Sequence, residues 1–156
     1  MVILIVDDSK MLRYMNIEAL RSLGYTNFVE ASDVPEARTK MQLNKIDLVI
    51  SDFHMPKETG LDLLKWIRAT PAYAGIPVIL LTTDGEKSVI ISIVQAGVQA
   101  YLLKPVKKES LGQKLVEISA KYGLQAPVLD GPPVHNTLPG AKPEPTGGIA
   151  IPPAQP

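Results

Sequence analysis

Four runs of four or five residues along the chain are apolar almost throughout and rich in β-branched side chains. Runs of this length and composition are typical of strands that are buried on both faces of a sheet. A mixed segment between the first two runs predicts one further strand. The five predicted strands are Val2–Val6, Asn27–Ala31, Leu48–Ser51, Val78–Leu81 and Ala100–Leu103.

Amphipathic segments separate these strands, and each of them predicts a helix. Ser9 is a good N-cap for the first helix, within which Leu12, Met15 and Leu20 recur at helical spacing. In the fourth segment, Val94 falls on an apolar arc that we expect to face inward. The predicted helices span about 10–23, 34–44, 61–69, 86–96 and 108–122.

The alternation of strands and helices determines the fold class. Strands separated by helices of this length require right-handed βαβ crossovers and a parallel sheet. Five such units over about 124 residues fit a flavodoxin-like, doubly wound α/β fold with a five-stranded parallel sheet in the order 2-1-3-4-5 and five helices. This order places the first strand beside the third, so the residues at their carboxyl ends are expected to lie close together.

Acidic residues stand at those two carboxyl ends. Asp7 and Asp8 follow the first strand, and Asp52 follows the third. Ligands of open parallel sheets bind beyond the carboxyl ends of the strands. Three carboxylates in that place repel one another unless they hold a proton or recruit a cation. Because oxygen ligands dominate and no cysteine or histidine cluster is nearby, Mg²⁺ is the expected cation.

A hydroxyl and an ammonium group follow the last two strands. Thr82 ends the fourth strand, and Lys104 follows the fifth, just before Pro105. Carboxylates, a divalent cation, a hydroxyl and a lysine together suit the binding of a phosphoryl group, since the cations neutralise its oxygens and the hydroxyl donates to one of them. The sequence therefore predicts phosphoryl chemistry at this edge of the sheet.

Composition narrows the class of protein without changing this prediction. The chain has 156 residues, which is enough for one domain with a proper core. It has 16 basic and 16 acidic side chains, and the lack of cysteine excludes a disulfide framework. The balanced charge and the lack of a basic stripe argue against direct nucleic-acid binding. Without a signal peptide or a long apolar stretch, the chain is expected to be cytoplasmic and not to bind membranes.

The composition changes after residue 124. Nine of the 14 prolines lie within residues 125–156, and the only charged residues there are Asp130, Lys142 and Glu144. Such a segment has too little apolar surface to repay the entropy of ordering it. We therefore expect one folded domain over residues 1–124 and a Pro-rich, disordered C-terminal tail over residues 125–156.

Five groups of residues at the ends of the predicted strands resemble the receiver domain of two-component response regulators, and in particular its CheY-like single-domain family. The resemblance covers about residues 1–123, which identifies the folded domain as a phosphoacceptor receiver. The groups are Asp7-Asp8, Asp52 with Met55-Pro56 and Gly60, Thr82, Tyr101, and Lys104-Pro105.

The resemblance implies that Asp52 is the phosphoacceptor, which takes the phosphoryl group from the phosphohistidine of a sensor histidine kinase. Asp8 and Asp52 would bind Mg²⁺ directly, together with the backbone carbonyl of His54. The carbonyl is the better ligand of that residue, since Mg²⁺ prefers oxygen to an imidazole nitrogen. Asp7 would hold a metal-bound water molecule.

The resemblance also implies a switch. Lys104 would contact the phosphoryl group and precede a cis bond to Pro105. Thr82 would move to donate a hydrogen bond to the phosphoryl oxygens, and Tyr101 would rotate inward behind it. This shift would remodel the face built from the fourth helix, the fifth strand and the fifth helix, through which a downstream protein partner would bind.

Other functions fit the residues less well. A haloacid-dehalogenase-type phosphatase with an aspartyl nucleophile places a D-x-D pair after the first strand, whereas here the pair is adjacent and the nucleophile follows the third. A flavodoxin needs hydroxyls and glycine in its first loop, where two carboxylates would repel the phosphate. We therefore expect a signalling protein rather than an enzyme, apart from its own phosphotransfer and autodephosphorylation. Chemotaxis with flagellar motor control, a phosphorelay intermediate and another kinase pathway remain open.

Overall fold

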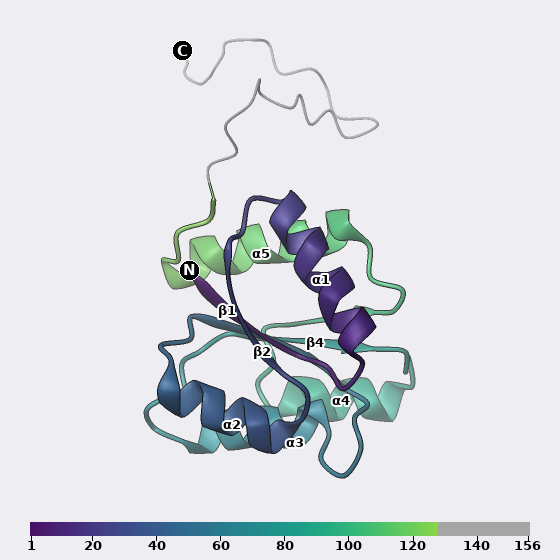
Figure 1. Ribbon diagram of the computed structural model, residues 1–156. Helices are drawn as coiled ribbons and strands as arrows, with labels where there is room; N and C mark the ends of the chain where they lie inside the picture. The colour runs from purple at the N-terminus through teal and green to yellow at the C-terminus, as the bar shows by residue number, and fades with distance from the viewer. Residues whose placement is uncertain (128–156) are drawn as a thin grey trace, which may run out of the picture.

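Five parallel strands form a single sheet in the order β2-β1-β3-β4-β5 in the computed structural model, which describes residues 1–127 (Figure 1). Five helices alternate with the strands along the chain, so the predicted flavodoxin-like fold is confirmed. The expected tail lies almost entirely outside the described residues and stays a prediction. The strands are β1 (Val2–Val6), β2 (Asn27–Ala31), β3 (Leu48–Asp52), β4 (Val78–Thr82) and β5 (Ala100–Leu103).

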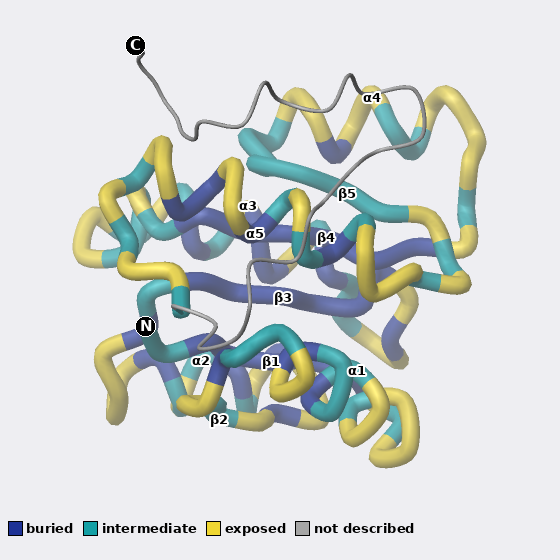
Figure 2. Tube along the Cα trace, turned by 90° about the horizontal axis from the view of Figure 1, so that it is seen from above, coloured by how far each residue is buried: buried dark blue, intermediate teal, exposed yellow. Residues whose placement is uncertain are grey.

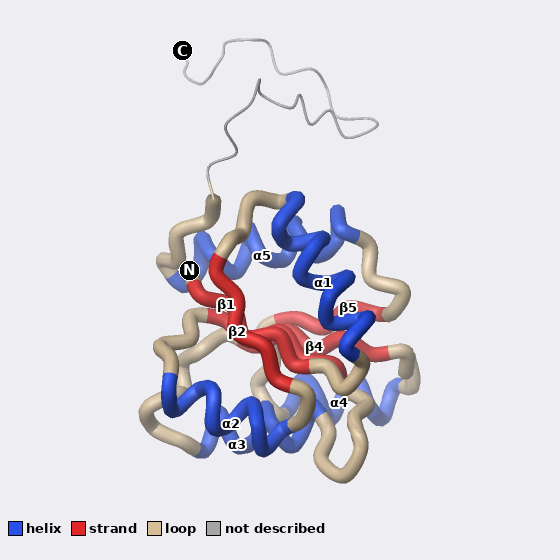
Figure 3. The backbone as a smooth tube through the Cα atoms, in the orientation of Figure 1, coloured by secondary structure: helices blue, strands red, loops and turns tan. Residues whose placement is uncertain are grey.

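The helices lie in two layers, one on each face of the sheet. One layer contains α1 (Lys10–Ser22) and α5 (Lys108–Tyr122). The other contains α2 (Val34–Leu43), α3 (Gly60–Ala69) and α4 (Lys87–Gln95). Figure 3 shows the sheet between the layers, and the buried apolar residues divide into two corresponding clusters. Burial on both faces explains why the inner strands are apolar without alternation.

The register of the strands sets the position of their carboxyl ends. Val6 in β1 lies opposite Ser51 in β3, so the residues that follow each of them reach the same edge of the sheet. On the other side of β3, Asp52 lies opposite Leu81. Figure 2 shows that β1, β3 and β4 are buried along most of their length, whereas β5 at the sheet edge is partly exposed. The acidic residues therefore stand at the ends of two of the most deeply buried strands of the sheet.

Helix caps follow the local sequence. Ser9 accepts a hydrogen bond from the Leu12 N–H at 3.2 Å, as predicted for an N-cap. At the start of α3, Thr59 and Asp62 form a capping box in which each side chain accepts from the other residue's backbone N–H. At the end of α5, Gly123 adopts a φ of +67°, the left-handed conformation that favours glycine.

The inward faces of two helices differ from the predictions. In α1, Ile17 and Leu20 are buried, whereas Leu12 and Met15 are exposed, the latter by 56%. In α4, Ile93 is buried and Val94 is 56% exposed. Both helices are apolar over more than one face, so periodicity alone leaves their rotation open. Packing against the sheet decides it, and the surplus apolar side chains remain in contact with solvent.

Candidate functional site

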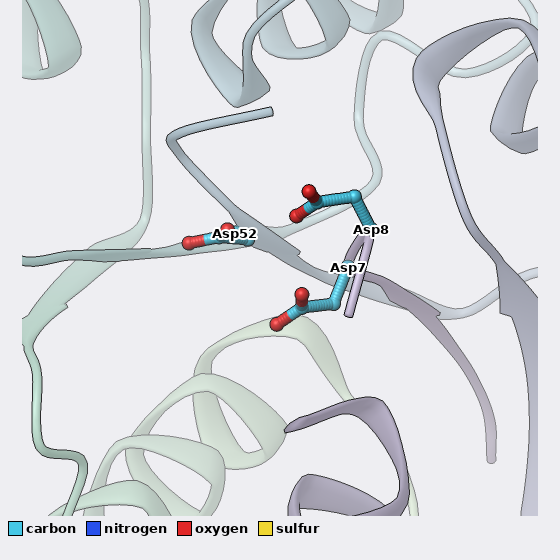
Figure 4. A group of neighbouring side chains, drawn as sticks. All are labelled: Asp7, Asp8 and Asp52. Carbon is cyan, nitrogen blue, oxygen red and sulfur yellow. The ribbon is translucent and has the colours of Figure 1, made fainter. Parts of the chain in front are cut away.

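Three carboxylates converge at the carboxyl edge of the sheet. Asp7 and Asp8 follow β1, Asp52 ends β3, and one oxygen of each lies within 4.8 Å of the others. Figure 4 shows the three side chains extending toward the same space from these two strand ends. The predicted convergence is confirmed, because β1 and β3 are neighbours and end at the same level.

The three carboxylates have different environments. Asp7 and Asp52 are 1% and 5% exposed, respectively, whereas Asp8 is exposed. Burial is the largest cause of a raised pKa for the Asp7 carboxyl, and the negative charges of Asp52 and Asp8 raise it further. The Ser9 N–H, which donates to Asp7 Oδ1 at 2.9 Å, and the charge of Lys104 oppose this shift in pKa. Burial and the neighbouring carboxylates therefore disfavour the charged form of Asp7.

Lys104 brings one positive charge to the cluster. Its Nζ lies 2.7 Å from Asp52 Oδ1 and 4.0 Å from Asp7 Oδ2. The backbone places this lysine, since its N–H donates to the Thr82 carbonyl at 2.8 Å and joins the ends of β4 and β5. The bond between Lys104 and Pro105 is cis, as the resemblance implied. The ammonium group thus lies directly beside the proposed phosphoacceptor.

The residues fit a bound divalent cation. Three carboxylates face a single ammonium group, so the cluster keeps an excess of negative charge. The buried oxygens Asp7 Oδ2 and Asp52 Oδ1 accept no aligned hydrogen bond, even though the ammonium is within ion-pairing distance of both. Oxygen ligands with unused lone pairs match the preference of hard cations. Within residues 1–127, no second group of three or more ligating side chains comes together in this way.

Thr82 lies at the end of β4, fully buried, next to the β3 end. Its Oγ1 accepts a hydrogen bond from the Asp84 N–H at 2.9 Å, which holds the hydroxyl toward the loop that follows β4. His54 lies two residues beyond Asp52 with an exposed side chain, whose ring packs edge-on against Phe53. The role of its carbonyl stays a prediction.

Tyr101 is the one proposed site residue that lies away from the carboxylates. It is half-buried in β5 opposite Leu80, two positions before the Thr82 level of β4. Its side chain lines a surface hollow of about 370 Å³ with five other residues. The other lining residues are Val94, Val98, Gln99, Ala100 and Lys114. This hollow lies on the face formed by α4, β5 and α5, where the resemblance places the switch.

The predictions from sequence missed Arg13, which contacts the acidic strand end. Its Nη1 donates to the backbone carbonyl of Asp7 at 2.7 Å, and its Nε donates to Glu30 Oε1 at 2.9 Å. A basic residue one turn into the helix after an acidic pair is the signal that was available. On its own, that signal does not distinguish an inward contact from a solvated charge.

A second feature that sequence reasoning left unexplained is Gly60, at the start of α3. A Cβ atom at this position would lie 2.4 Å from the Asp52 carbonyl oxygen. The close approach brings the helix start against the strand end that carries the carboxylate.

Among the helices of residues 1–127, none is long and apolar enough to span a membrane.

Comparisons with known proteins agree with this geometry. The family model described as the response regulator receiver domain matches residues 3–116. The chemotaxis protein CheY of Pseudomonas aeruginosa is 37% identical over 118 residues, which are 76% of this chain and 95% of that protein. The chemotaxis protein CheY1 of Helicobacter pylori strain J99 is 39% identical over 116 residues, 74% of this chain and 94% of that protein. The solved structure of chemotaxis protein CheY4 from Vibrio cholerae matches with a TM-score of 0.70 and 32% identity, covering 75% of this chain and 97% of that one.

Proposed function

The chain belongs to the response regulator receiver family, and we propose that this CheY-like two-component response regulator accepts a phosphoryl group on Asp52 in the presence of Mg²⁺. The observation that carries the proposal is the environment of the Asp52 carboxylate. It is 5% exposed, lies among two other carboxylates and has the Lys104 ammonium 2.7 Å away. The donor is the phosphohistidine of a sensor histidine kinase.

Transfer requires an Asp52 oxygen to attack the phosphorus as the bond to the donor imidazole breaks, which leaves an acyl phosphate on the protein. The Mg²⁺ ion would be held by Asp8, Asp52 and the His54 carbonyl, and Asp7 would hold a metal-bound water molecule. The bound ion would neutralise phosphoryl oxygens and orient the two reactants. Lys104 exchanges its ion pair with Asp52 for one with the phosphoryl oxygens. Because donor and acceptor are brought into line by these groups, the weak nucleophilicity of a carboxylate suffices.

Output follows from the new charge. A phosphoryl group adds oxygens that accept hydrogen bonds strongly at the end of β3. The Thr82 hydroxyl exchanges its contact with the Asp84 N–H for one with these oxygens, and Tyr101 moves inward from the surface hollow. The face of α4, β5 and α5 then presents a different surface to a downstream protein.

A CheY-type receiver is a signalling protein, and we propose that its catalysis is limited to its own phosphotransfer and autodephosphorylation. Chemotaxis is the favoured pathway, since the relatives compared above are chemotaxis proteins. Residues 1–124 form the receiver domain of this proposal. The family match within residues 3–116 supports that boundary, as does the end of α5 at Tyr122.

The test is labelling with acetyl phosphate, followed by mass spectrometry of the intact protein and of its peptides. Labelling is expected to require Mg²⁺, to vanish in Asp52→Asn and to weaken together with Mg²⁺ affinity in Asp8→Asn. Glu117→Gln is the control, because it removes an acidic group from an exposed ion pair on α5 and leaves the site intact. Location of the label on Asp7 or Asp8 would overturn the assignment of the phosphoacceptor.

A further inference from the structure

Arg13 holds the peptide bond that joins the two acidic residues of β1's carboxyl end. The carbonyl that receives its Nη1–H at 2.7 Å belongs to Asp7, so this carbonyl is part of the Asp7–Asp8 peptide plane. The rotation of that plane determines the direction in which the Asp8 side chain leaves the backbone. A charged donor on one atom of the plane therefore restricts the direction of the Asp8 carboxylate.

The arginine is itself held by two further contacts and is largely buried. Its backbone N–H donates to the Ser9 carbonyl at 2.9 Å, within the first turn of α1. Its Nε donates to Glu30 near the end of β2, the strand beside β1. Its side chain is only 13% exposed, far less than a surface arginine such as Arg21 at 58%. Because Glu30 already holds the guanidinium at Nε, little further entropy is lost when Nη1 donates to the Asp7 carbonyl.

The Asp7 side chain is fixed by a separate contact, the Ser9 N–H at 2.9 Å from its Oδ1. Asp8 is exposed and adjoins the peptide that Arg13 contacts. In metal sites, removal of a group that orients a ligand typically lowers the affinity for the metal about 10- to 100-fold. In this arrangement, the Ser9 N–H orients the Asp7 carboxylate, and Arg13 orients the peptide bond that leads to the Asp8 carboxylate.

We propose that Arg13 is a positioning residue for divalent-cation binding, acting through the Asp7–Asp8 peptide bond to aim the Asp8 carboxylate at the site. The inference rests on the proposed function, since it assumes that the carboxylate cluster binds Mg²⁺. It assigns to Arg13 no contact with the cation or with the phosphoryl group.

A purely electrostatic role for Arg13 predicts the opposite sign. Removal of a cation near three carboxylates makes the site more negative, which would tighten Mg²⁺ binding. Loss of positioning instead weakens binding, because the free site then samples directions of Asp8 that do not bind. Substitution of a group that orients a metal ligand costs about tenfold or more in affinity. The sign of the change in affinity therefore decides between the two roles.

The experiment is calorimetric titration of the full chain with Mg²⁺ alone, supported by Mn²⁺ binding measured by electron paramagnetic resonance. Arg13→Ala is expected to raise the Kd about tenfold. Arg13→Lys keeps the charge without the fork and should give an intermediate Kd. Arg21→Ala is the matched control, because it removes an arginine of the same helix from an exposed ion pair with Glu18, and its Kd should equal that of the wild type.

A second measurement separates positioning from general damage. In labelling by acetyl phosphate, the Mg²⁺ concentration for half-maximal rate should rise in Arg13→Ala, while the rate at saturating Mg²⁺ stays near that of the wild type. An unchanged or lower Kd in Arg13→Ala would overturn the inference, as would an equal loss at saturating Mg²⁺. If Arg13→Ala does not fold, an unchanged Kd in Arg13→Lys overturns the inference. Failure of the wild type to bind Mg²⁺ would instead refute the proposed function.

Discussion

Gly60 packs its α-carbon against the backbone of the strand that carries Asp52, and its replacement by alanine tests how tightly α3 and β3 are joined. An added Cβ would lie 2.4 Å from the Asp52 carbonyl oxygen, 3.0 Å from Leu80 Cδ2 and 3.1 Å from the Phe53 Cα. The Gly60 N–H also donates to the Phe53 carbonyl at 2.9 Å. Two of the three clashes are with backbone atoms of the central strand or its extension, which cannot move alone.

The magnitude follows from two opposing effects. Overpacking in a well-packed interior costs about 1–3 kcal/mol, and a clash with backbone belongs at the upper end of that range. Alanine recovers at most about 1 kcal/mol of helix propensity relative to glycine. We therefore expect Gly60→Ala to lower the free energy of unfolding by about 2 kcal/mol. The same displacement moves the Asp52 carbonyl, so labelling of Asp52 should also slow.

The assay is urea unfolding followed by circular dichroism, with the labelling rate measured in parallel. Gly75→Ala is the matched control, since a Cβ there meets nothing within 4 Å, and it should change stability by less than about 0.5 kcal/mol. A stability of Gly60→Ala equal to that of Gly75→Ala would refute the argument, because it would show that the helix and strand can separate at no cost.

Two other predictions concern charge and output. Because the folded-state pKa of Asp7 is raised, the stability linked to this group is fully present below its unfolded pKa and is lost as pH rises through the folded pKa. Asp7→Asn should therefore melt at a higher temperature than the wild type at neutral pH without Mg²⁺, with a difference that shrinks on acidification; a lower melting temperature at neutral pH would contradict this. Ile91 is 43% exposed on α4, and Ile91→Lys should preserve folding and Asp52 labelling. The same variant should weaken binding of the beryllofluoride-activated form to a flagellar switch protein at least several-fold. The control Leu43→Lys, at the exposed end of α2, should not weaken this binding. Equal affinities of these two variants would move the output surface elsewhere.

The local sequence was sufficient for the elements and their order. Apolar runs marked four of the five strands to within a residue, and a mixed segment marked β2. The signal is strongest in β1, β3 and β4, because a strand buried on both faces leaves no place for polar residues. The Ser9 cap marked the start of α1, and α5 spans Lys108–Tyr122 as predicted. These signals are local, since a cap or a buried run acts on its own neighbourhood whatever the rest of the chain does.

The position of the three carboxylates also followed from sequence, once the strand order was known. Asp7, Asp8 and Asp52 each stand at a strand end, and the order 2-1-3-4-5 brings those ends together. The convergence therefore needed only the topology, which the lengths of the connecting segments already restrict. The proposed role of each side chain depends on chemistry that labelling and metal binding will test.

The faces and contacts that the helices use depend on how the elements pack together. Met15 and Val94 are exposed, because the rotation of a helix depends on the neighbours against which it docks rather than on its own apolar spacing. The contacts of Arg13 join α1, β1 and β2, and the close approach of Gly60 joins α3 to β3. Each of these contacts depends on distances between segments that are remote in the chain. Local patterns and strand order were therefore enough to predict the elements and the acidic edge, whereas the contacts that hold this edge in place arise from packing between distant segments.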